Sequence, residues 1–251
     1  MENMYGIIAG VCVILAGVFG SMLGLMFKKI SHRMNDMILG FASGVMLTAA
    51  FLGLLPTAFE PFSWKTALTG AAGIFAGALL ISFIDKFVPH IHFDGGHMRG
   101  EHGEGESSGV LLLVIAIAIH NIPEGLATGI VFSEGITDSA LLVALSMIVQ
   151  KIPEGLIVIV PLLGMGMKKL KAFGLSSLIA FMMLPGIVVG VLLGALPALL
   201  TSFFYAVTFG AIVYVVSDEI IPESHEHGNE RAATFALLAG VLMVVLMQYG
   251  L

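Results

Sequence analysis

Eight long apolar segments, separated by short polar connections, account for almost the whole 251-residue chain. A helix needs about 20 apolar residues to cross the hydrocarbon core of a bilayer, and each segment comes close to or exceeds that length. The pattern therefore predicts an all-α polytopic membrane protein with eight transmembrane helices, folded as a single domain over residues 1–251. The segments cover residues 5–27, 37–59, 66–89, 109–132, 138–164, 173–196, 201–222 and 232–250.

Composition agrees with this prediction. Charged residues make up only 11% of the chain, whereas a soluble domain needs about 25% to hydrate its surface. We therefore expect a multi-pass protein of the plasma membrane, or of the bacterial cytoplasmic membrane if the source is prokaryotic, with the lipid bilayer around it. No basic tract of the kind that follows a nucleic-acid backbone is present, so no nucleic-acid partner is expected.

The distribution of basic residues predicts the orientation. Nine of the eleven Lys and Arg residues lie in the connections that follow odd-numbered segments. Positive charge gathers on the cytoplasmic side, so these connections are expected in the cytoplasm and both termini outside. The nine residues are Lys28, Lys29, Arg33, Lys86, Arg99, Lys168, Lys169, Lys171 and Arg231.

The longest polar stretch, residues 90–108, lies in one of these cytoplasmic connections. It is rich in Gly, His and carboxylates, with too little apolar content to fold by itself, and it predicts a flexible loop. Its histidines, His90, His92, His97 and His102, could capture metal. A solvated polar linker is an equally good interpretation.

The fourth and fifth segments contain the residues that a membrane should reject. The fourth contains His-Asn-Ile-Pro-Glu-Gly at 120–125, and the fifth contains Gln-Lys-Ile-Pro-Glu-Gly at 150–155. We call these the two Pro-Glu-Gly motifs. Ionisable groups at membrane depth are costly and usually mark a site or a pathway.

Helical spacing groups the polar residues of each motif. His120 and Glu124 are four residues apart and share one helical face, and Gln150 and Glu154 repeat that spacing. Each proline also leaves a backbone carbonyl free at the same depth. This mixed nitrogen and oxygen donor set suits zinc, iron(II), manganese or cadmium. Structural hydrogen bonds between helices are the alternative, although two matched motifs favour a functional site.

These residues resemble the ZIP family, the Zrt-/Irt-like metal transporters, of bacterial type. The resemblance rests on the two Pro-Glu-Gly motifs, and the eight segments, the outside termini and the His-rich loop also match. It implies a binuclear metal centre between the two motif helices. His120, Glu124, Gln150 and Glu154 match the first metal position, and Met46 resembles the thioether that bacterial members add there.

The second metal position departs from the family pattern. Family members usually have a metal-binding Asp or Asn where Lys151 stands, and often a Glu before the proline of the sixth segment, where this chain has Leu184. Asn121 remains as a donor. We expect one metal, with the Lys151 ammonium substituting for the second cation. The alternative is that Lys151 turns away towards the membrane surface.

The seventh segment ends in a cluster of polar residues that also resembles the family, where such residues lie on the cytoplasmic exit. Solvation of a helix end explains them equally well. The residues are Asp218, Glu219, Glu223 and His225.

Together these features predict a transporter that moves divalent metal ions such as zinc by alternating access. Import is the direction that the resemblance implies. The chain is not expected to be an enzyme or to carry a catalytic cofactor, because the metal is the substrate. An intramembrane zinc metalloenzyme and a metal sensor are the alternatives, but His-Glu-x-x-His is absent. The sequence leaves a homodimer open.

Overall fold

The computed structural model describes residues 2–27, 30–86, 91–94, 97–100, 120–133 and 135–250. The described chain is almost entirely helical, which confirms the all-α prediction. The first half contains α1 (Glu2–Gly24), α2 (His32–Ala49), the π-helical turn η1 (Ala50–Leu54), α3 (Leu55–Phe59) and α4 (Trp64–Asp85). A short antiparallel hairpin follows, made of β1 (Ile91–Asp94) and β2 (His97–Gly100).

The second half begins with a helix over residues 120–130, which we call the His120 helix. It continues with α6 (Asp138–Gly164), α7 (Lys169–Phe181), α8 (Leu184–Gly194), α9 (Ala198–Val215), η2 (Val216–Ile220), α10 (Ile221–Ser224) and α11 (Glu230–Gly250).

Seven of the eight predicted segments are helices long and apolar enough to cross a membrane within the described residues. The fourth, predicted at 109–132, is described only from residue 120 onward, as the His120 helix. The seven spans are Met4–Gly24, His32–Phe59, Trp64–Ile84, Asp138–Gly164, Lys169–Gly194, Ala198–Ser224 and Glu230–Gly250.

Three of these spans are interrupted next to a proline. Pro56 and Pro222 stand at the starts of α3 and α10, and in each case a π-helical turn precedes them. Pro185 starts α8 after a break from α7. A proline lacks the amide hydrogen and clashes with the carbonyl four residues earlier, so the helix widens or breaks there. The apolar pattern continues through each interruption, so hydropathy alone does not reveal where these helices are interrupted.

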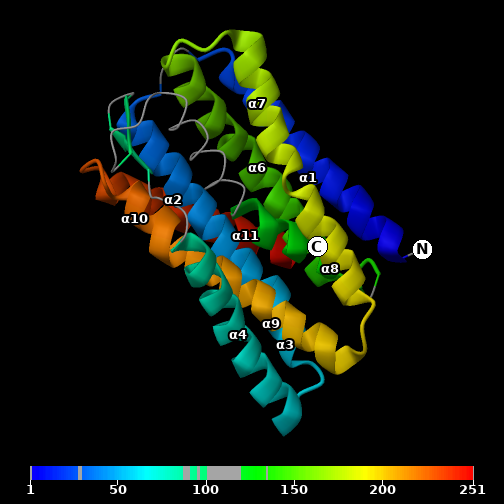
Figure 1. The fold of residues 1–251 in the computed structure, drawn as a ribbon. Helices are drawn as coiled ribbons and strands as arrows, with labels where there is room; N and C mark the ends of the chain where they lie inside the picture. The colour runs from blue at the N-terminus through cyan, green and yellow to red at the C-terminus, as the bar shows by residue number, and fades with distance from the viewer. Residues whose placement is uncertain are drawn as a thin grey trace.

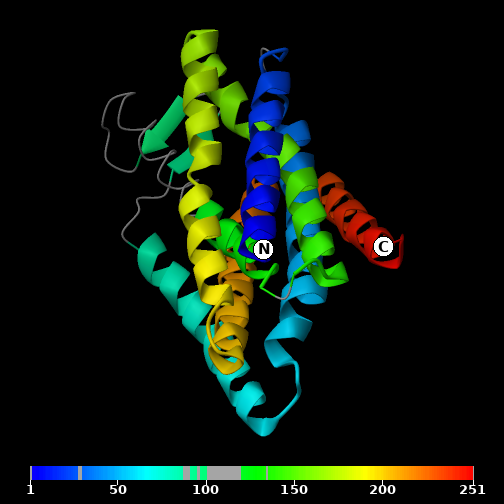
Figure 2. The same ribbon diagram turned by 90° about the vertical axis from the view of Figure 1, so that its right-hand side faces the viewer.

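The helices form a bundle in which the most extensive contacts join α1 to α6, α2 to α11 and α4 to α9 (Figure 1). Figure 2 shows α4 and α11 at opposite edges of the bundle. These two helices are also the least buried spans, and α11 exposes Phe235, Leu238 and Leu242. Exposed apolar side chains on an outer helix suit contact with lipid chains.

The connections between spans alternate between the two ends of the bundle. Figure 2 shows the hairpin and the link from α6 to α7 towards one end, and the links from α3 to α4 and from α8 to α9 at the other. The basic residues Lys168, Lys169 and Lys171 belong to the first end. The positive-inside rule predicts that this end faces the cytoplasm.

Two parts of the predicted loop, Ile91–Asp94 and His97–Gly100, form the paired strands β1 and β2. His90 and His102, and the side chains of His92 and His97, lie outside what the structure describes. The predicted role of these four histidines in metal capture therefore stays a prediction.

Candidate metal centre

The glycines of the two Pro-Glu-Gly motifs hold the motif helices against their neighbours. A Cβ atom added at Gly155 would stand 2.2 Å from the carbonyl oxygen of Gly17 on α1. A Cβ atom at Gly125 would stand 2.4 Å from the carbonyl oxygen of Met183, where α7 breaks before α8. Both distances are far inside van der Waals contact, so only glycine allows these approaches. Close packing behind each motif fixes the position of the glutamate beside it.

Glu124 is the more enclosed of the two motif glutamates, Glu124 and Glu154. Its residue is 2% exposed. The carboxamide of Gln150 donates a hydrogen bond from Nε2 to Glu124 Oε1 over 2.6 Å, and the ammonium of Lys151 forms an ion pair with Glu124 Oε2. A buried charge is tolerated when it is paired and hydrogen-bonded in this way.

Lys151 lies at the centre of the polar cluster. Its residue is 3% exposed, and its Nζ contacts both Glu124 and Glu154, the latter at 2.6 Å. The same ammonium donates a hydrogen bond to Asn121 Oδ1. Lys151 therefore points into the bundle and does not turn towards the membrane surface.

Asn121 connects this cluster to a further helix. Its Nδ2 donates a hydrogen bond to the carbonyl oxygen of Ile179 on α7 over 3.0 Å, while its Oδ1 accepts from Lys151. The His120 helix, α6 and α7 are thus joined at one depth by polar contacts, and this network links five predicted site residues. They are Asn121, Glu124, Gln150, Lys151 and Glu154.

His120, the remaining nitrogen donor of the motifs, is directed elsewhere. Its Nε2 contacts Glu219 Oε2 of η2. Within the described part of the chain, no three His, Cys, Asp or Glu side chains converge as they would around a bound metal. The carboxylates of this region are therefore already paired. His120 contacts Glu219, and Lys151 contacts Glu124 and Glu154.

Met46 lies in α2 and is 2% exposed. It belongs to the main apolar core, together with Met147 of α6. Both core packing and a thioether ligand agree with this position.

The four predicted exit residues do not form one cluster. Glu219 contacts His120, whereas Asp218 and Glu223 are exposed. The ring of His225 bonds locally, with Nδ1 2.8 Å from the carbonyl oxygen of Ile221 and Nε2 3.3 Å from Thr234 Oγ1. Of the four, only Glu219 is therefore in contact with a motif residue.

A polar cluster around Asp36, near the start of α2, was not predicted. Asp36 is fully buried, and its carboxylate accepts hydrogen bonds from Asn229 Nδ2 at 2.9 Å and meets His227 Nδ1 at 3.0 Å. The His227 ring also stacks on His32, with centroids 4.4 Å apart. Asp36 joins α2 to the turn before α11, 191 residues later in sequence. Its only sequence signal is a carboxylate directly before an apolar segment.

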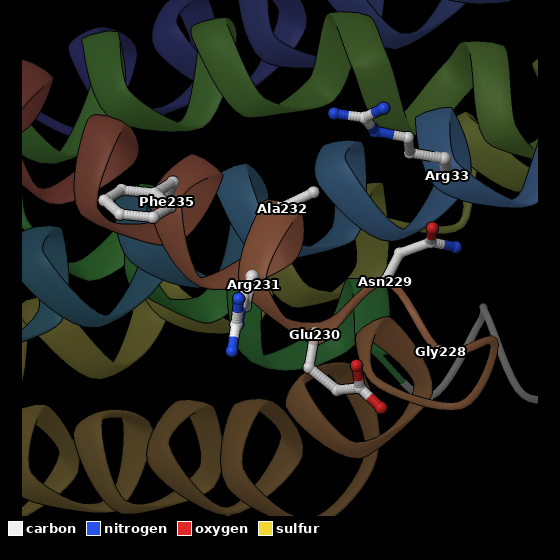
Figure 3. Close-up of a pocket in the computed structure, with 7 residues that line it drawn as sticks. All are labelled: Arg33, Gly228, Asn229, Glu230, Arg231, Ala232 and Phe235. Carbon is white, nitrogen blue, oxygen red and sulfur yellow. The ribbon is translucent and has the colours of Figure 1, made fainter.

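A pocket of about 460 Å³ opens beside this cluster, at the start of α11. Figure 3 shows the guanidinium groups of Arg33, on α2, and Arg231, on α11, pointing to different sides, and the Glu230 side chain directed away from that of Arg231. Guanidinium groups are cations and cannot bind a metal. The pocket is lined by Arg33, Gly228, Asn229, Glu230, Arg231, Ala232 and Phe235.

The donor chemistry of the motif cluster suits a divalent cation. It offers two carboxylates, a carboxamide and, after release from Glu219, an imidazole. Carboxamide oxygen Oε1 of Gln150 is buried and has no hydrogen-bond partner among the described residues. A borderline metal such as zinc accepts this combination of nitrogen and oxygen donors.

Comparisons with known proteins agree with this reading. The profile of the ZIP zinc transporter family matches residues 92–248. Zinc transporter ZIPB of Bordetella bronchiseptica is 34% identical over 263 residues, which cover 98% of this chain and 81% of that protein. Zinc transporter GufA of Myxococcus xanthus is 34% identical over 74% of this chain and 73% of its own length. Zinc transporter ZupT of Clostridium perfringens is 31% identical over 97% of this chain and 96% of its own length.

The names of these relatives are those of transporters, not of enzymes. Their matches extend over most of this chain, including both Pro-Glu-Gly motifs, and the described residues contain seven membrane-spanning helices. The chain is a multi-pass membrane protein that belongs to the ZIP zinc transporter family.

Proposed function

We propose that this protein carries divalent metal ions, zinc above all, from the outside into the cytoplasm through a site between the His120 helix and α6. The observation that carries the proposal is the buried Glu124 carboxylate, held by Gln150 and Lys151 inside an apolar bundle. A charged network at this depth usually marks a pathway. The names of the family relatives support zinc as the substrate.

The metal is bound by His120, Glu124, Gln150 and Glu154, with the Met46 thioether as a further donor. His120 must first exchange its contact with Glu219 for the metal. Binding therefore couples the motif helices to η2, which begins the cytoplasmic end of its span. After release, Glu219 provides the next oxygen, followed by the exposed Asp218 and Glu223 and the partly buried His225.

One metal is bound at a time, because Lys151 provides the second positive charge. With both carboxylates ionised, Glu124 and Glu154 carry two negative charges, and the ammonium leaves a net charge of −1. One divalent ion then makes the buried cluster +1, whereas two would make it +3 within a medium that screens charge poorly. Repulsion of like charges thus limits occupancy to one ion.

Every donor in this proposal comes from a single chain, so a homodimer would leave the site unchanged. The donor set also admits iron(II), manganese and cadmium. Competition between zinc and each of these metals in a flux assay would rank them.

Metal uptake into sealed liposomes tests the proposal. Purified protein is reconstituted around a zinc-sensitive dye, and zinc is added outside. Time-dependent entry that protein-free liposomes lack is the expected result. A metalloenzyme or a sensor would bind zinc without flux, and that outcome would refute the proposed function. Vesicles sorted by orientation would show faster flux in the importing direction.

A further inference from the structure

Two buried oxygen atoms on one face of α6 lack partners. Ser146 Oγ and Gln150 Oε1 have no hydrogen-bond partner among the described residues, although the two residues are 0% and 1% exposed. They are four positions apart, so they lie on the same face of the helix, about 6 Å apart along its axis. Buried polar groups are normally hydrogen-bonded, and an exception requires an explanation such as a water molecule or an ion.

The hydroxyl of Ser146 departs from a rule that several other hydroxyl groups in the spans follow. Several other buried hydroxyl groups in the spans donate to the carbonyl four residues earlier, a common choice for Ser and Thr in membrane helices. Ser146 has such a carbonyl at Leu142 and makes no bond to it. The hydroxyl groups that follow the rule are those of Ser43, Thr48, Thr128 and Thr208, at 2.8–2.9 Å.

The hydrogen bond from Gln150 to Glu124 determines the direction of the free carboxamide oxygen of Gln150. Its Nε2 is held by Glu124 at 2.6 Å, and this bond fixes the plane of the carboxamide and directs Oε1 away from Glu124. Ser146 lies one turn nearer than Gln150 to Asp138, the start of α6. Under the predicted orientation, that start faces the outside. The two oxygens therefore lie before the carboxylates on the inward path.

We propose that Ser146 Oγ and Gln150 Oε1 form an outer position for a divalent cation that still carries part of its water shell. This inference rests on the proposed function and adds Ser146 as a residue that sets affinity and metal preference. Two neutral oxygens bind a cation weakly, which suits a short stay before transfer to Glu124. Oxygen donors also favour harder cations, so this position selects zinc over the softer cadmium.

The test compares the Ser146→Ala variant with Ser43→Ala in the liposome uptake assay. Ser43 is equally buried and donates to the carbonyl of Leu39 at 2.9 Å, so it matches Ser146 in residue type and burial but has no free oxygen. Loss of one neutral ligand should raise the KM for zinc about threefold to tenfold in Ser146→Ala and leave the maximal rate near wild type. Ser43→Ala should leave KM unchanged.

Two further variants distinguish a metal ligand at Ser146 from a residue that only packs in the core. Ser146→Cys nearly conserves volume and replaces oxygen by sulfur, so it should raise the ratio of cadmium to zinc uptake by a similar factor. In a Gln150→Ala background, Ser146→Ala should add little further loss, because the shared position is already broken.

Equal KM values for Ser146→Ala and Ser43→Ala, with an unchanged cadmium preference in Ser146→Cys, would overturn this inference while wild-type uptake continued to support the proposed function. A wild-type protein without uptake would overturn the proposed function and this inference together. Fully additive losses in the double variant would also contradict a shared position.

Discussion

The two Pro-Glu-Gly motifs share a backbone plan and differ in how their glutamates are held. In both, the glycine lets a neighbouring backbone approach, at Gly17 for one motif and Met183 for the other. Glu124 contacts Gln150 and Lys151, and its side chain is 3% exposed, whereas Glu154 contacts Lys151 and its side chain is 25% exposed. The repeat therefore provides one anchored carboxylate and one that is freer to move. If both glutamates bind the metal as proposed, Glu124 should contribute more to binding than Glu154.

The largest effect on zinc uptake is expected from replacing His120 or Glu124, the donors of the first motif. His120→Ala and Glu124→Ala should abolish zinc uptake, because each removes a primary donor and Glu124→Ala also leaves Lys151 with one carboxylate fewer. Uptake in liposomes and the amount of folded protein in detergent should be measured together. Glu124→Gln is the matched control for shape, and it should fold normally and still lose uptake. Normal uptake in both alanine variants would contradict the assignment.

Zinc uptake should tolerate replacement of Glu154, the less enclosed glutamate, better than replacement of Glu124. Glu154→Gln should reduce zinc uptake by about tenfold without abolishing it, since one ligand is weakened and Glu124 keeps its hydrogen bond and ion pair. Initial rates over a range of zinc concentrations measure this. Equal losses in Glu154→Gln and Glu124→Gln would remove the distinction between the two motifs.

Lys151 connects the two motifs, and its replacement should affect stability first. Lys151→Met leaves both carboxylates without their cation, and breaking a buried pair costs about 3–5 kcal/mol. The variant should therefore unfold at lower temperature than wild type in metal-free detergent. Zinc should restore more stability to the variant than to the wild type, because the ion replaces the missing charge. A variant as stable as wild type without metal would show that Lys151 is not needed as a counter-charge.

The packing behind the motifs should give a smaller effect. Gly155→Ala places a Cβ atom 2.2 Å from the carbonyl oxygen of Gly17, so α1 must shift at a cost of about 1–3 kcal/mol. Gly174→Ala is the control, since no atom lies within 4 Å of an added Cβ there. Thermal unfolding should separate the two variants. Equal midpoints would show that the close approach at Gly155 does not constrain the bundle.

The smallest effect is expected from the predicted loop at 90–108. Deletion of 94–106 should leave the maximal rate within about twofold of wild type, because a polar surface segment tolerates deletion when its flanking helices are intact. Uptake at saturating and at low zinc checks this, and a loss confined to low zinc would indicate metal capture by the loop. Complete loss of uptake in a folded variant would place the loop in the pathway.

Hydropathy was sufficient to predict the seven spans that the described residues contain, because membrane thickness fixes their length. It could not predict that Pro56, Pro185 and Pro222 interrupt three of them, since a π turn or a break leaves the apolar pattern unchanged. Helical spacing placed His120 with Glu124 and Gln150 with Glu154 within their own helices. The family resemblance implied that the two motif helices face each other, as the contacts of Glu124 with Gln150 and Lys151 require. Contacts between distant segments had no such signal.

Two contacts illustrate this limit. His120 contacts Glu219, 99 residues away, and Asp36 contacts His227, 191 residues away. Each depends on how complete helices pack, which local periodicity does not encode. The direction of Lys151 was similarly open from sequence, and burial between Glu124 and Glu154 decided it.

In the proposed mechanism Lys151 replaces a second metal ion, and anomalous diffraction from zinc-soaked crystals counts the bound ions. We predict one well-occupied zinc bound by Glu124 in the wild-type protein, with Lys151 still directed into the bundle. Lys151→Asp should gain a second zinc, because a cation is replaced by a ligand. Two well-occupied ions in the wild-type site, with Lys151 turned away, would contradict the account.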